Sequence, residues 1–278
     1  MRAGSYVLVT GASRGLGRAF AEEAARRACN LVLVALPGTG LSLVAASLLQ
    51  RYAVELRAFE VDLADRPSLV AMAEWVAHAG LDLSLLVNNA GVDAPGTFDE
   101  AGTGRVSAVV EVNVQALTEL THLLLPVLRR RPRSAIINIA SLAAFYPMPA
   151  MAVYAASKSY VLSFSLALRE ELRGTDVSVT AVCPGGILTN TESIARIHAQ
   201  GFFGRFTARR PEQVVRAALR GARRGRPIVV PGWPNQLLRF LGVAFPKAVV
   251  ARVIGGRFGK GAGAGPSAAP VDGSRSSL

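Results

Sequence analysis

Short runs rich in β-branched residues alternate along the chain with longer segments that have the apolar spacing of helices. The first two runs are YVLVT at residues 6–10 and LVLVA at residues 31–35, and an apolar-periodic segment at residues 15–28 separates them. Strands of four to eight residues that alternate with helices of this length form repeated βαβ units. Because such units build a parallel sheet with helices on both faces, the chain is predicted to be a doubly wound α/β protein. The later expected strands are residues 54–61, 83–91, 134–141, 177–185 and 227–232, and further expected helices include residues 67–79 and 104–130.

Length and composition favour one domain with an appended end. The chain has 278 residues, of which 51% are hydrophobic, and this is enough to bury a large single core. We expect a dinucleotide-binding and catalytic domain at residues 1–232 and a basic amphipathic helical extension at residues 233–260. Residues 261–278 read GAGAGPSAAPVDGSRSSL and have no periodic apolar face, so we expect them to be disordered.

Three features of the sequence predict a cytoplasmic protein. The two cysteines, Cys29 and Cys183, stand in apolar segments without a metal-binding spacing, which fits a reducing compartment. Strand-like sequence begins by Tyr6 and leaves no room for a signal peptide. No uncharged apolar run reaches the roughly 18 to 20 residues that a membrane-spanning helix needs.

The three histidines stand apart from other ligand types, so no metal site is expected.

A glycine-rich turn follows the first expected strand. It reads TGASRGLG and places glycines at positions 11, 15 and 17. Glycine at such a strand-to-helix turn lets the backbone approach a pyrophosphate, which helix N-terminal amides then hold. Glycines also make tight turns, but the place of this one before an alternating βα array predicts a dinucleotide site.

This GxxxGxG spacing, together with NNAG at residues 88–91 and the segment at 141–160, resembles the classical short-chain dehydrogenase/reductase family. The resemblance covers residues 5–232, and the end of the chain is similar to a bacterial subgroup of broad-specificity reductases. It implies a seven-stranded Rossmann-type sheet and a nicotinamide cofactor. It also implies hydride transfer between that cofactor and a carbonyl or secondary alcohol.

One of the five tyrosines has a lysine four residues later in the sequence. A phenol with a pKa near 10 becomes a useful base near neutral pH only if a nearby cation favours the phenolate. Residues four apart on a helix lie one turn from each other, and Lys158 stands in this place relative to Tyr154. The alternative is an exposed helical Tyr and Lys without a chemical role.

The resemblance assigns four catalytic residues. It implies that Tyr154 is the general acid/base and that Lys158 binds the nicotinamide ribose and lowers the phenol pKa. Ser141, thirteen residues before Tyr154, matches the family serine that hydrogen-bonds the substrate oxygen. Asn113 matches the asparagine that supports a proton-relay water.

The resemblance also implies a set of cofactor contacts. Asp62 resembles the aspartate that contacts the adenine amino group, and its alternative role is a helix N-cap. Asn89 is expected to tie its strand to neighbouring backbone and so to shape the cofactor site. PGGILTN at residues 184–190 resembles the segment that meets the nicotinamide carboxamide. The expected cofactor-binding residues are Gly11, Ser13, Arg14, Gly15, Leu16, Gly17, Asp62, Asn89, Tyr154, Lys158, Ile187 and Thr189.

The end of the second strand favours NADP, although NAD stays possible. An acid there would bind the ribose hydroxyls of NAD, but this chain has Ala35 and Leu36. Arg14 could meet the 2′-phosphate of NADP with a bidentate contact. Many NADP-binding members carry a basic residue where Leu36 or Pro37 stands, so the preference rests on one arginine.

The expected substrate region is apolar, which indicates a medium or large apolar carbonyl compound. Residues 142–151 contribute Phe145, Tyr146, Met148 and Met151. Residues 191–206 resemble the loop that covers substrate in this family, although their GFFGRF motif could equally pack in the core.

Positive charge is concentrated near the end of the chain. Residues 205–260 hold thirteen Lys or Arg and one acid, Glu212, whereas the rest of the chain is neutral overall. Apolar and basic residues intermix at 234–260, as in segments that lie on an anionic membrane, here the inner face. The alternative is two short helices, begun at Pro234 and Pro246, that pack on the substrate loop or on another subunit. Nucleic-acid binding is not expected, because charge is the only feature that favours it.

These observations predict an NADP-preferring carbonyl reductase or alcohol dehydrogenase that forms a homodimer or homotetramer. The alternative from another class is a non-catalytic nucleotide-sensing or membrane-tethered interaction protein with the same fold. Such a protein would usually have lost Tyr154 or Lys158, and this chain has both.

Overall fold

The computed structural model of the chain describes residues 2–188 and 206–258. Its strands are β1 (Tyr6–Thr10), β2 (Asn30–Ala35), β3 (Leu56–Glu60), β4 (Leu83–Asn88), β5 (Ser134–Ile139), β6 (Val177–Val182) and β7 (Ile228–Val229). Its helices are α1 (Gly15–Arg26), α2 (Leu41–Arg51), α3 (Arg66–His78), α4 (Thr103–Val110), η1 (Glu111–Ala116), α5 (Leu117–Arg129), η2 (Leu142–Phe145), α6 (Ala152–Glu171), α9 (Pro211–Arg223), α10 (Trp233–Ala244) and α11 (Lys247–Phe258).

The seven strands form one parallel sheet in the order β3-β2-β1-β4-β5-β6-β7. β1 lies in the middle, where Val9 is in register with Leu33 of β2 and with Val87 of β4. The order of the strands reverses between β1 and β4, and ligands of such sheets bind at the carboxyl ends of the strands near this point. The predicted seven-stranded doubly wound fold is confirmed.

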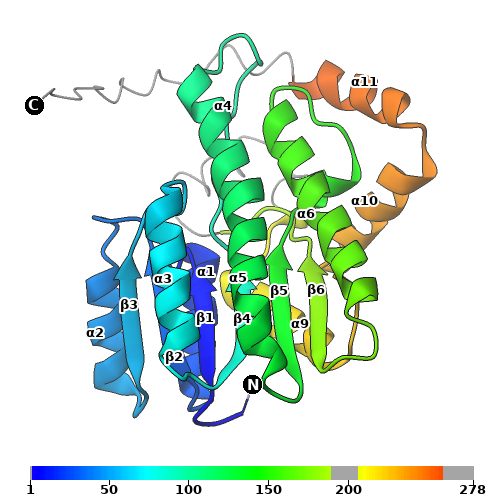
Figure 1. Ribbon diagram of the computed structural model, residues 1–278. Helices are drawn as coiled ribbons and strands as arrows, with labels where there is room; N and C mark the ends of the chain where they lie inside the picture. The colour runs from blue at the N-terminus through cyan, green and yellow to red at the C-terminus, as the bar shows by residue number, and fades with distance from the viewer. Residues whose placement is uncertain (1, 189–205, 259–278) are drawn as a thin grey trace, which may run out of the picture.

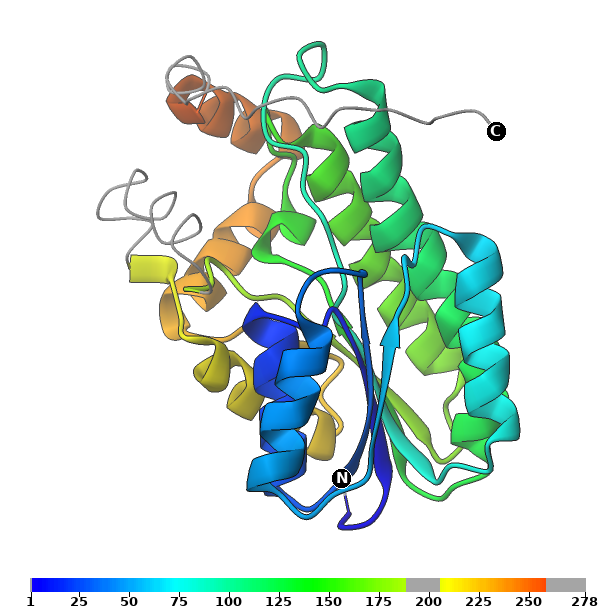
Figure 2. The same cartoon turned by 90° about the vertical axis from the view of Figure 1, so that its left-hand side faces the viewer.

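Helices cover both faces of the sheet (Figures 1 and 2). Successive side chains of a strand point to opposite faces, so Val7 and Val9 pack under α1, α2 and α9. Tyr6 and Leu8 pack on the other face under α3, α5 and α6. These two apolar layers hold the strand ends in place at the edge where the candidate site lies.

The expected helix at residues 104–130 is continuous but not uniform. It consists of α4, the π-helical segment η1 and α5, and Asn113 lies within η1. π-Helical segments inside α-helices occur frequently at functional sites. The helical spacing of the sequence predicted the helix but gave no sign of this segment.

Two helices follow the last strand, and in Figure 1 they lie beyond the carboxyl ends of the strands. α10 carries Pro234 in its first turn, where the missing backbone N–H costs nothing, and α11 begins directly after Pro246. Among the described residues, no helix has both the length and the apolar character needed to cross a bilayer. The expected disordered tail at 261–278 and most of the expected loop at 191–206 lie outside the described residues.

Candidate active site

The candidate site is built where the ends of β1 and β4 meet. The Asn89 side-chain amide donates to the carbonyl oxygens of Thr10 (2.8 Å) and Gly11 (3.3 Å). The Thr10 hydroxyl accepts hydrogen bonds from the backbone N–H groups of Asn89 and Ala90, both at 3.0 Å. Asn89 therefore ties its loop to the glycine turn, as the sequence predicted. Sequence reasoning missed Thr10, although its place at the end of the first strand was visible.

The glycine turn is so compact that Gly17 has no room for a side chain. A Cβ atom there would overlap the carbonyl oxygen of Gly11 and lie 2.6 Å from Nδ2 of Asn89. The backbone of Gly17 therefore packs directly against that of Gly11, and this close approach holds the start of α1 against the end of β1.

The first turn of α1 has the properties of a phosphate site. Its N-cap residue, Arg14, makes no side-chain capping bond, and no acid stands in the first turn. The first amides of a helix point outward without intrahelical partners, and the helix dipole favours an anion at this end. Gly15 is half-buried and leaves its backbone accessible, whereas Gly17 and the Leu16 side chain are buried. This arrangement fits the diphosphate of a dinucleotide held by backbone amides, with Ser13 half-buried beside it.

The adenosine end of the predicted site holds one acid that the sequence pattern did not reveal. Ala35 at the end of β2 is in register with Glu60 at the end of β3, and Leu36 is half exposed. A carboxylate oxygen of Glu60 accepts a 3.5 Å hydrogen bond from the backbone of Gly38. Parallel pairing thus places a carboxylate beside the turn after β2, even though β2 itself ends without an acid.

Asp62 does not cap a helix. Its carboxylate accepts a hydrogen bond from the backbone N–H of Ala64 at 2.9 Å, which forms a local turn. The N-cap of α3 is Asp65, whose side chain accepts from Ser68 N–H at 3.3 Å. The capping alternative for Asp62 is therefore wrong. Asp62 is exposed just after β3, where a nucleotide base could reach it.

Asn113 is fully buried and uses its whole side-chain amide. Its Nδ2 donates to the Val92 carbonyl oxygen (2.9 Å) and to Ser157 Oγ (3.0 Å), and its Oδ1 accepts from the Val92 N–H (2.9 Å). Ser157 in turn donates to the carbonyl oxygen of Tyr154 at 2.7 Å. The Asn113 side chain thus links the loop after β4 to the first turn of α6. A water relay at Asn113 would have to use the backbone, because the side chain is already engaged.

Lys158 and Tyr154 lie on the same side of α6, one turn apart. Lys158 Nζ is buried, donates a 3.0 Å hydrogen bond to the Ile139 carbonyl oxygen and lies 5.8 Å from the centre of the Tyr154 ring. Burial lowers the pKa of Lys158 to about 8. The ammonium therefore stays mostly charged at neutral pH, and it is held against the end of β5.

Ser141 lies two residues after β5 and is the N-cap residue of η2. Its hydroxyl oxygen accepts a 3.1 Å hydrogen bond from the Ala143 N–H. η2 is fastened to α6 because the Ser159 hydroxyl donates to the Ala144 carbonyl oxygen at 2.9 Å. Ser141 and Tyr154 thus stand on two elements that are packed and hydrogen-bonded to each other.

Two other tyrosines near the site are held by packing. The Tyr146 ring lies against Gly242 of α10, and burial raises its pKa to about 12. Tyr160 shares a 2.9 Å hydrogen bond with Thr118 and stacks on Phe164. Lys158 lies over the ring of Tyr154, and neither Tyr146 nor Tyr160 has such a neighbour in the described part of the chain.

The segment expected to meet the nicotinamide is only partly described. Ile187 makes a parallel bridge with Arg209, and this bridge brings the loop after β6 beside the segment that leads into α9. The Ile187 side chain packs on the core, so its backbone is the part that could face a cofactor. Thr189 lies outside the described residues.

A buried amide network under the site was not predicted. Asn88 and Asn138 are paired in register across β4 and β5, and Asn88 Nδ2 donates to Asn138 Oδ1 at 2.8 Å. Asn88 also donates to Thr121 of α5, and Asn138 donates to Ser165 of α6, both at 2.9 Å. The network fixes both helices to the sheet below the catalytic residues. The sequence feature that could have predicted this network is an asparagine near the end of each of two apolar strands.

Comparison with known proteins identifies the family. The sequence model described as short chain dehydrogenase matches residues 5–199. The very-long-chain 3-oxoacyl-CoA reductase of Anas platyrhynchos is 30% identical over 220 residues, which are 78% of this chain and 68% of that protein. The ketoacyl reductase HetN of Nostoc is 34% identical over 182 residues, 66% of this chain and 63% of that protein.

A solved structure agrees with these relatives. The short-chain dehydrogenase from Sphingobium yanoikuyae in complex with NADPH superposes with a TM-score of 0.75 at 29% identity. The match covers 96% of this chain and 99% of that chain. This chain is therefore a member of the short-chain dehydrogenase family and an oxidoreductase that uses a nicotinamide cofactor.

Proposed function

We propose that this protein reduces the carbonyl group of a medium or large apolar substrate with NADPH and that Tyr154 protonates the developing alkoxide. The observation that carries the proposal is the buried ammonium of Lys158 beside the Tyr154 ring, at the carboxyl edge of the sheet. The nicotinamide, when bound, supplies the hydride in reduction and accepts it in oxidation.

The charge of Lys158 acts in the direction that the proposal needs, because a cation near a phenol favours the phenolate. Lowering a phenol pKa from about 10 to about 7 requires roughly 4 kcal/mol. Lys158 Nζ lies 5.8 Å from the centre of the Tyr154 ring, and a cation this near favours the phenolate form.

Ser141 and Asn113 have separate roles in this proposal. The Ser141 hydroxyl donates to the substrate oxygen while its lone pair holds the Ala143 N–H, so the donor is oriented before substrate arrives. Asn113 positions the start of α6 through Ser157, and its backbone supports the proton relay.

The proposed preference for NADPH depends on the balance between Arg14 and Glu60. Arg14 is exposed at the N-cap of α1 and can meet a 2′-phosphate with paired hydrogen bonds. The Glu60 carboxylate beside the same region opposes that phosphate. We infer a modest preference for NADPH and retained use of NADH. Asp62 would contact the adenine, and Ile187 and Thr189 the nicotinamide carboxamide.

The four residues of the expected apolar substrate region differ in their exposure. Phe145 is buried with the Arg239 guanidinium 5.3 Å from its ring centre, and Tyr146 packs on α10. These two residues hold α10 in place, whereas Met148 and Met151 stay half-buried beside the start of α6. Relatives named for 3-oxoacyl-CoA and ketoacyl substrates support a fatty 3-oxoacyl thioester as the first substrate class to test.

A substrate screen tests the proposal. Purified protein is mixed with NADPH and 3-oxoacyl thioesters of increasing chain length, cyclic ketones or steroid ketones, and nicotinamide absorbance is followed. We expect turnover that improves with apolar chain length. Cofactor binding without turnover of any carbonyl or alcohol, in either direction, would instead favour the non-catalytic alternative.

The family of this protein and its surface support two further proposals, one on its cellular compartment and one on its oligomeric state. We propose a cytoplasmic homodimer or homotetramer, and the exposed apolar side chains of Val110 on α4 and Tyr160 on α6 support self-association through these helices. Both cysteines, Cys29 and Cys183, are buried free thiols, which fits a reducing compartment. Sedimentation at several concentrations tests the first proposal.

We also propose peripheral contact with an anionic membrane through residues 234–260. Phe240, Val243, Phe245 and Val253 are each at least half exposed, and no acid stands between Glu212 and the end of α11. Apolar side chains among basic ones suit the headgroup region of an anionic bilayer. Vesicle co-sedimentation with and without residues 233–278 tests this contact.

A further inference from the structure

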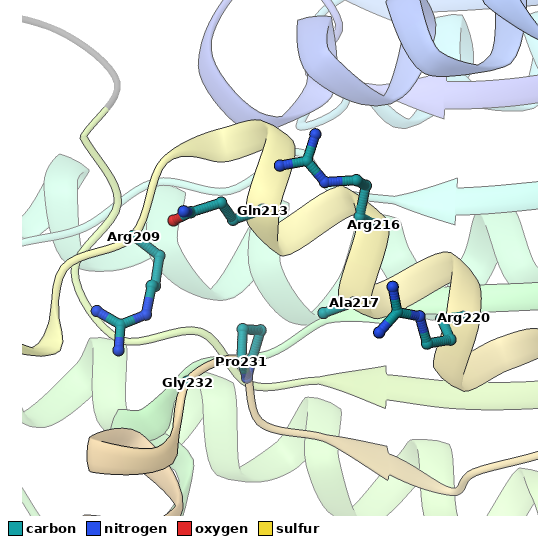
Figure 3. Close-up of a pocket in the computed structure, with 7 residues that line it drawn as sticks. All are labelled: Arg209, Gln213, Arg216, Ala217, Arg220, Pro231 and Gly232. Carbon is teal, nitrogen blue, oxygen red and sulfur yellow. The ribbon is translucent and has the colours of Figure 1, made fainter.

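Three arginines line a shallow cleft that the catalytic proposal does not use. The cleft has a volume of about 250 Å³ and lies between α9 and the turn of residues 231–232. Arg209, Arg216 and Arg220 are among its lining residues together with Gln213, and Figure 3 shows them along α9 and the segment that leads into it. Pockets for drug-sized ligands start at roughly 300 Å³, so this cleft suits a small charged group better than a whole substrate.

The cleft arginines lack acidic partners within residues 2–188 and 206–258. Some exposed arginines on other helices are paired, such as Arg27 with Glu23 at 2.6 Å and Arg51 with Glu22 at 2.7 Å, whereas others, such as Arg18 and Arg105, have no ion pair among the described residues. Arg216 and Arg220 stand four residues apart on α9, where like charges repel and weaken a helix. A bound anion would turn this repulsion into attraction.

Arg209 is held in place before any ligand arrives. Its guanidinium donates to the carbonyl oxygens of Phe206 (3.1 Å) and Ala208 (2.7 Å). It also lies against Gly232, where a Cβ atom would stand 2.6 Å from its Nε. Gly232 has a φ of +91°, which disfavours any other residue. The backbone turn thus fixes one wall of the cleft around the guanidinium.

An exposed apolar stripe begins at the edge of the cleft. Trp233 follows Gly232, is 66% exposed and packs edge-on against Phe206 with ring centres 5.2 Å apart. Leu237, Phe240 and Leu241 follow it at helical spacing along α10, and all three are exposed. At a membrane–water interface, arginine lies near the headgroups, tryptophan lies at the interface and apolar side chains lie deeper. The cleft arginines, Trp233 and the apolar stripe follow one another in this order.

We propose that this cleft binds the phosphate of an anionic phospholipid headgroup while the Trp233 stripe enters the boundary with the acyl chains. The inference rests on the membrane contact proposed above and assigns its polar site. A second copy of the chain fits less well. A symmetric contact through this surface would bring mainly arginines against arginines, because Glu212 is the only acid in residues 206–258.

Matched double variants test the headgroup site. Arg216→Gln with Arg220→Gln removes two cleft charges, and Arg223→Gln with Arg224→Gln removes two exposed charges from the end of α9 outside the cleft. Partition is measured on vesicles of phosphatidylglycerol with phosphatidylcholine, and on phosphatidylcholine alone. We expect the cleft pair to weaken binding to the anionic vesicles about thirtyfold and the control pair less than about threefold. Reduction of a soluble ketone should stay unchanged in both proteins.

The double variant Trp233→Ser with Leu237→Ser separates two claims: that the apolar stripe contacts a membrane, and that the cleft binds the lipid headgroup. If this variant loses vesicle binding while the two arginine pairs behave alike, membrane contact stands and the cleft site is wrong. If glycerol phosphate binds at the cleft arginines but no protein partitions onto vesicles, the anion is a free phosphate and the lipid assignment is overturned. If the stripe variant dissolves a dimer that forms without lipid, a second copy is the true occupant.

Discussion

The ammonium of Lys158 stands 5.8 Å from the centre of the Tyr154 ring, and a hydrogen bond to the end of β5 holds it there. This relationship joins two parts of the fold. α6 supplies both side chains, and the sheet fixes where the charge can lie.

Replacing Tyr154 by phenylalanine should remove the proton donor and leave the fold intact. We expect kcat to fall about 10²- to 10⁴-fold, the range of general acid–base catalysis, with little change in cofactor affinity. Tyr160→Phe is the matched control, because Tyr160 is exposed on the same helix and bonds only to Thr118 among the described residues. Similar kcat values for the two variants would contradict the assignment of Tyr154.

Lys158→Met should change how stability depends on pH. The pKa of Lys158 is about 8 in the folded chain against 10.5 for an ordinary lysine. Between these values the unfolded chain binds a proton that the folded chain does not, so wild-type stability rises with pH. Below pH 8 the burial cost is constant. We therefore expect the free energy of unfolding of the wild type, relative to that of the variant, to increase by roughly 3 kcal/mol as the pH rises from 8 to 10.5.

Urea unfolding of both proteins at pH 7, 8.5 and 10 measures this difference. Groups remote from Lys158 titrate alike in the two proteins and cancel, and repeating the comparison in the Tyr154→Phe background removes the contribution of the neighbouring phenol. A difference that stays constant over this range would show that the lysine titrates normally. Reductase activity of the variant should be lost at every pH, because its side chain carries no charge.

Ser157→Ala should break the link between Asn113 and the start of α6. One buried N–H of Asn113 would lose its partner, at a cost of about 1–3 kcal/mol in stability. The carbonyl oxygen of Tyr154 would also lose its hydroxyl donor. We therefore expect kcat to fall with little change in KM, since the tyrosine is positioned less well.

Ser165→Ala is the control for this positioning role. Ser165 is also buried on α6, accepts from the amide of Asn138 and donates to the Val161 carbonyl oxygen. It should cost similar stability but leave kcat nearly unchanged, because it lies about two turns from Ser157. Equal losses of kcat in the two variants would mean that general destabilisation, not positioning, explains the effect.

The sequence predicts those parts of the fold and site that depend on neighbours along the chain. Alternating strand and helix patterns predict the parallel sheet, and the four-residue spacing of Tyr154 and Lys158 places them one turn apart. Asn89 was correctly expected to tie its loop to the backbone, because it directly follows a strand beside the glycine turn.

Relationships that depend on strand register were not predictable in this way. Asn88 meets Asn138 because β4 and β5 pair in that register, and Glu60 reaches the turn after β2 because β3 ends beside it. Choosing between Asp62 and Asp65 as the cap of α3 required knowing the first helical residue. The burial of Phe145 depends on a helix that begins about ninety residues later.

Cofactor preference should respond in opposite directions to changes at Arg14 and Glu60. Arg14→Ala removes the only cation expected at the 2′-phosphate, and a charge-assisted hydrogen bond contributes about 1.5–3 kcal/mol. We expect the preference for NADPH over NADH, as a ratio of kcat/KM, to fall about ten- to hundredfold.

Glu60→Gln keeps the shape of the side chain but removes its negative charge. It should raise the same ratio by roughly two- to fivefold, as expected for an exposed charge. Arg18→Ala, exposed one turn further along α1, is the control and should leave the ratio unchanged. If Glu60→Gln lowers the ratio, its carboxylate does not face the 2′-phosphate, and the preference must come from other residues.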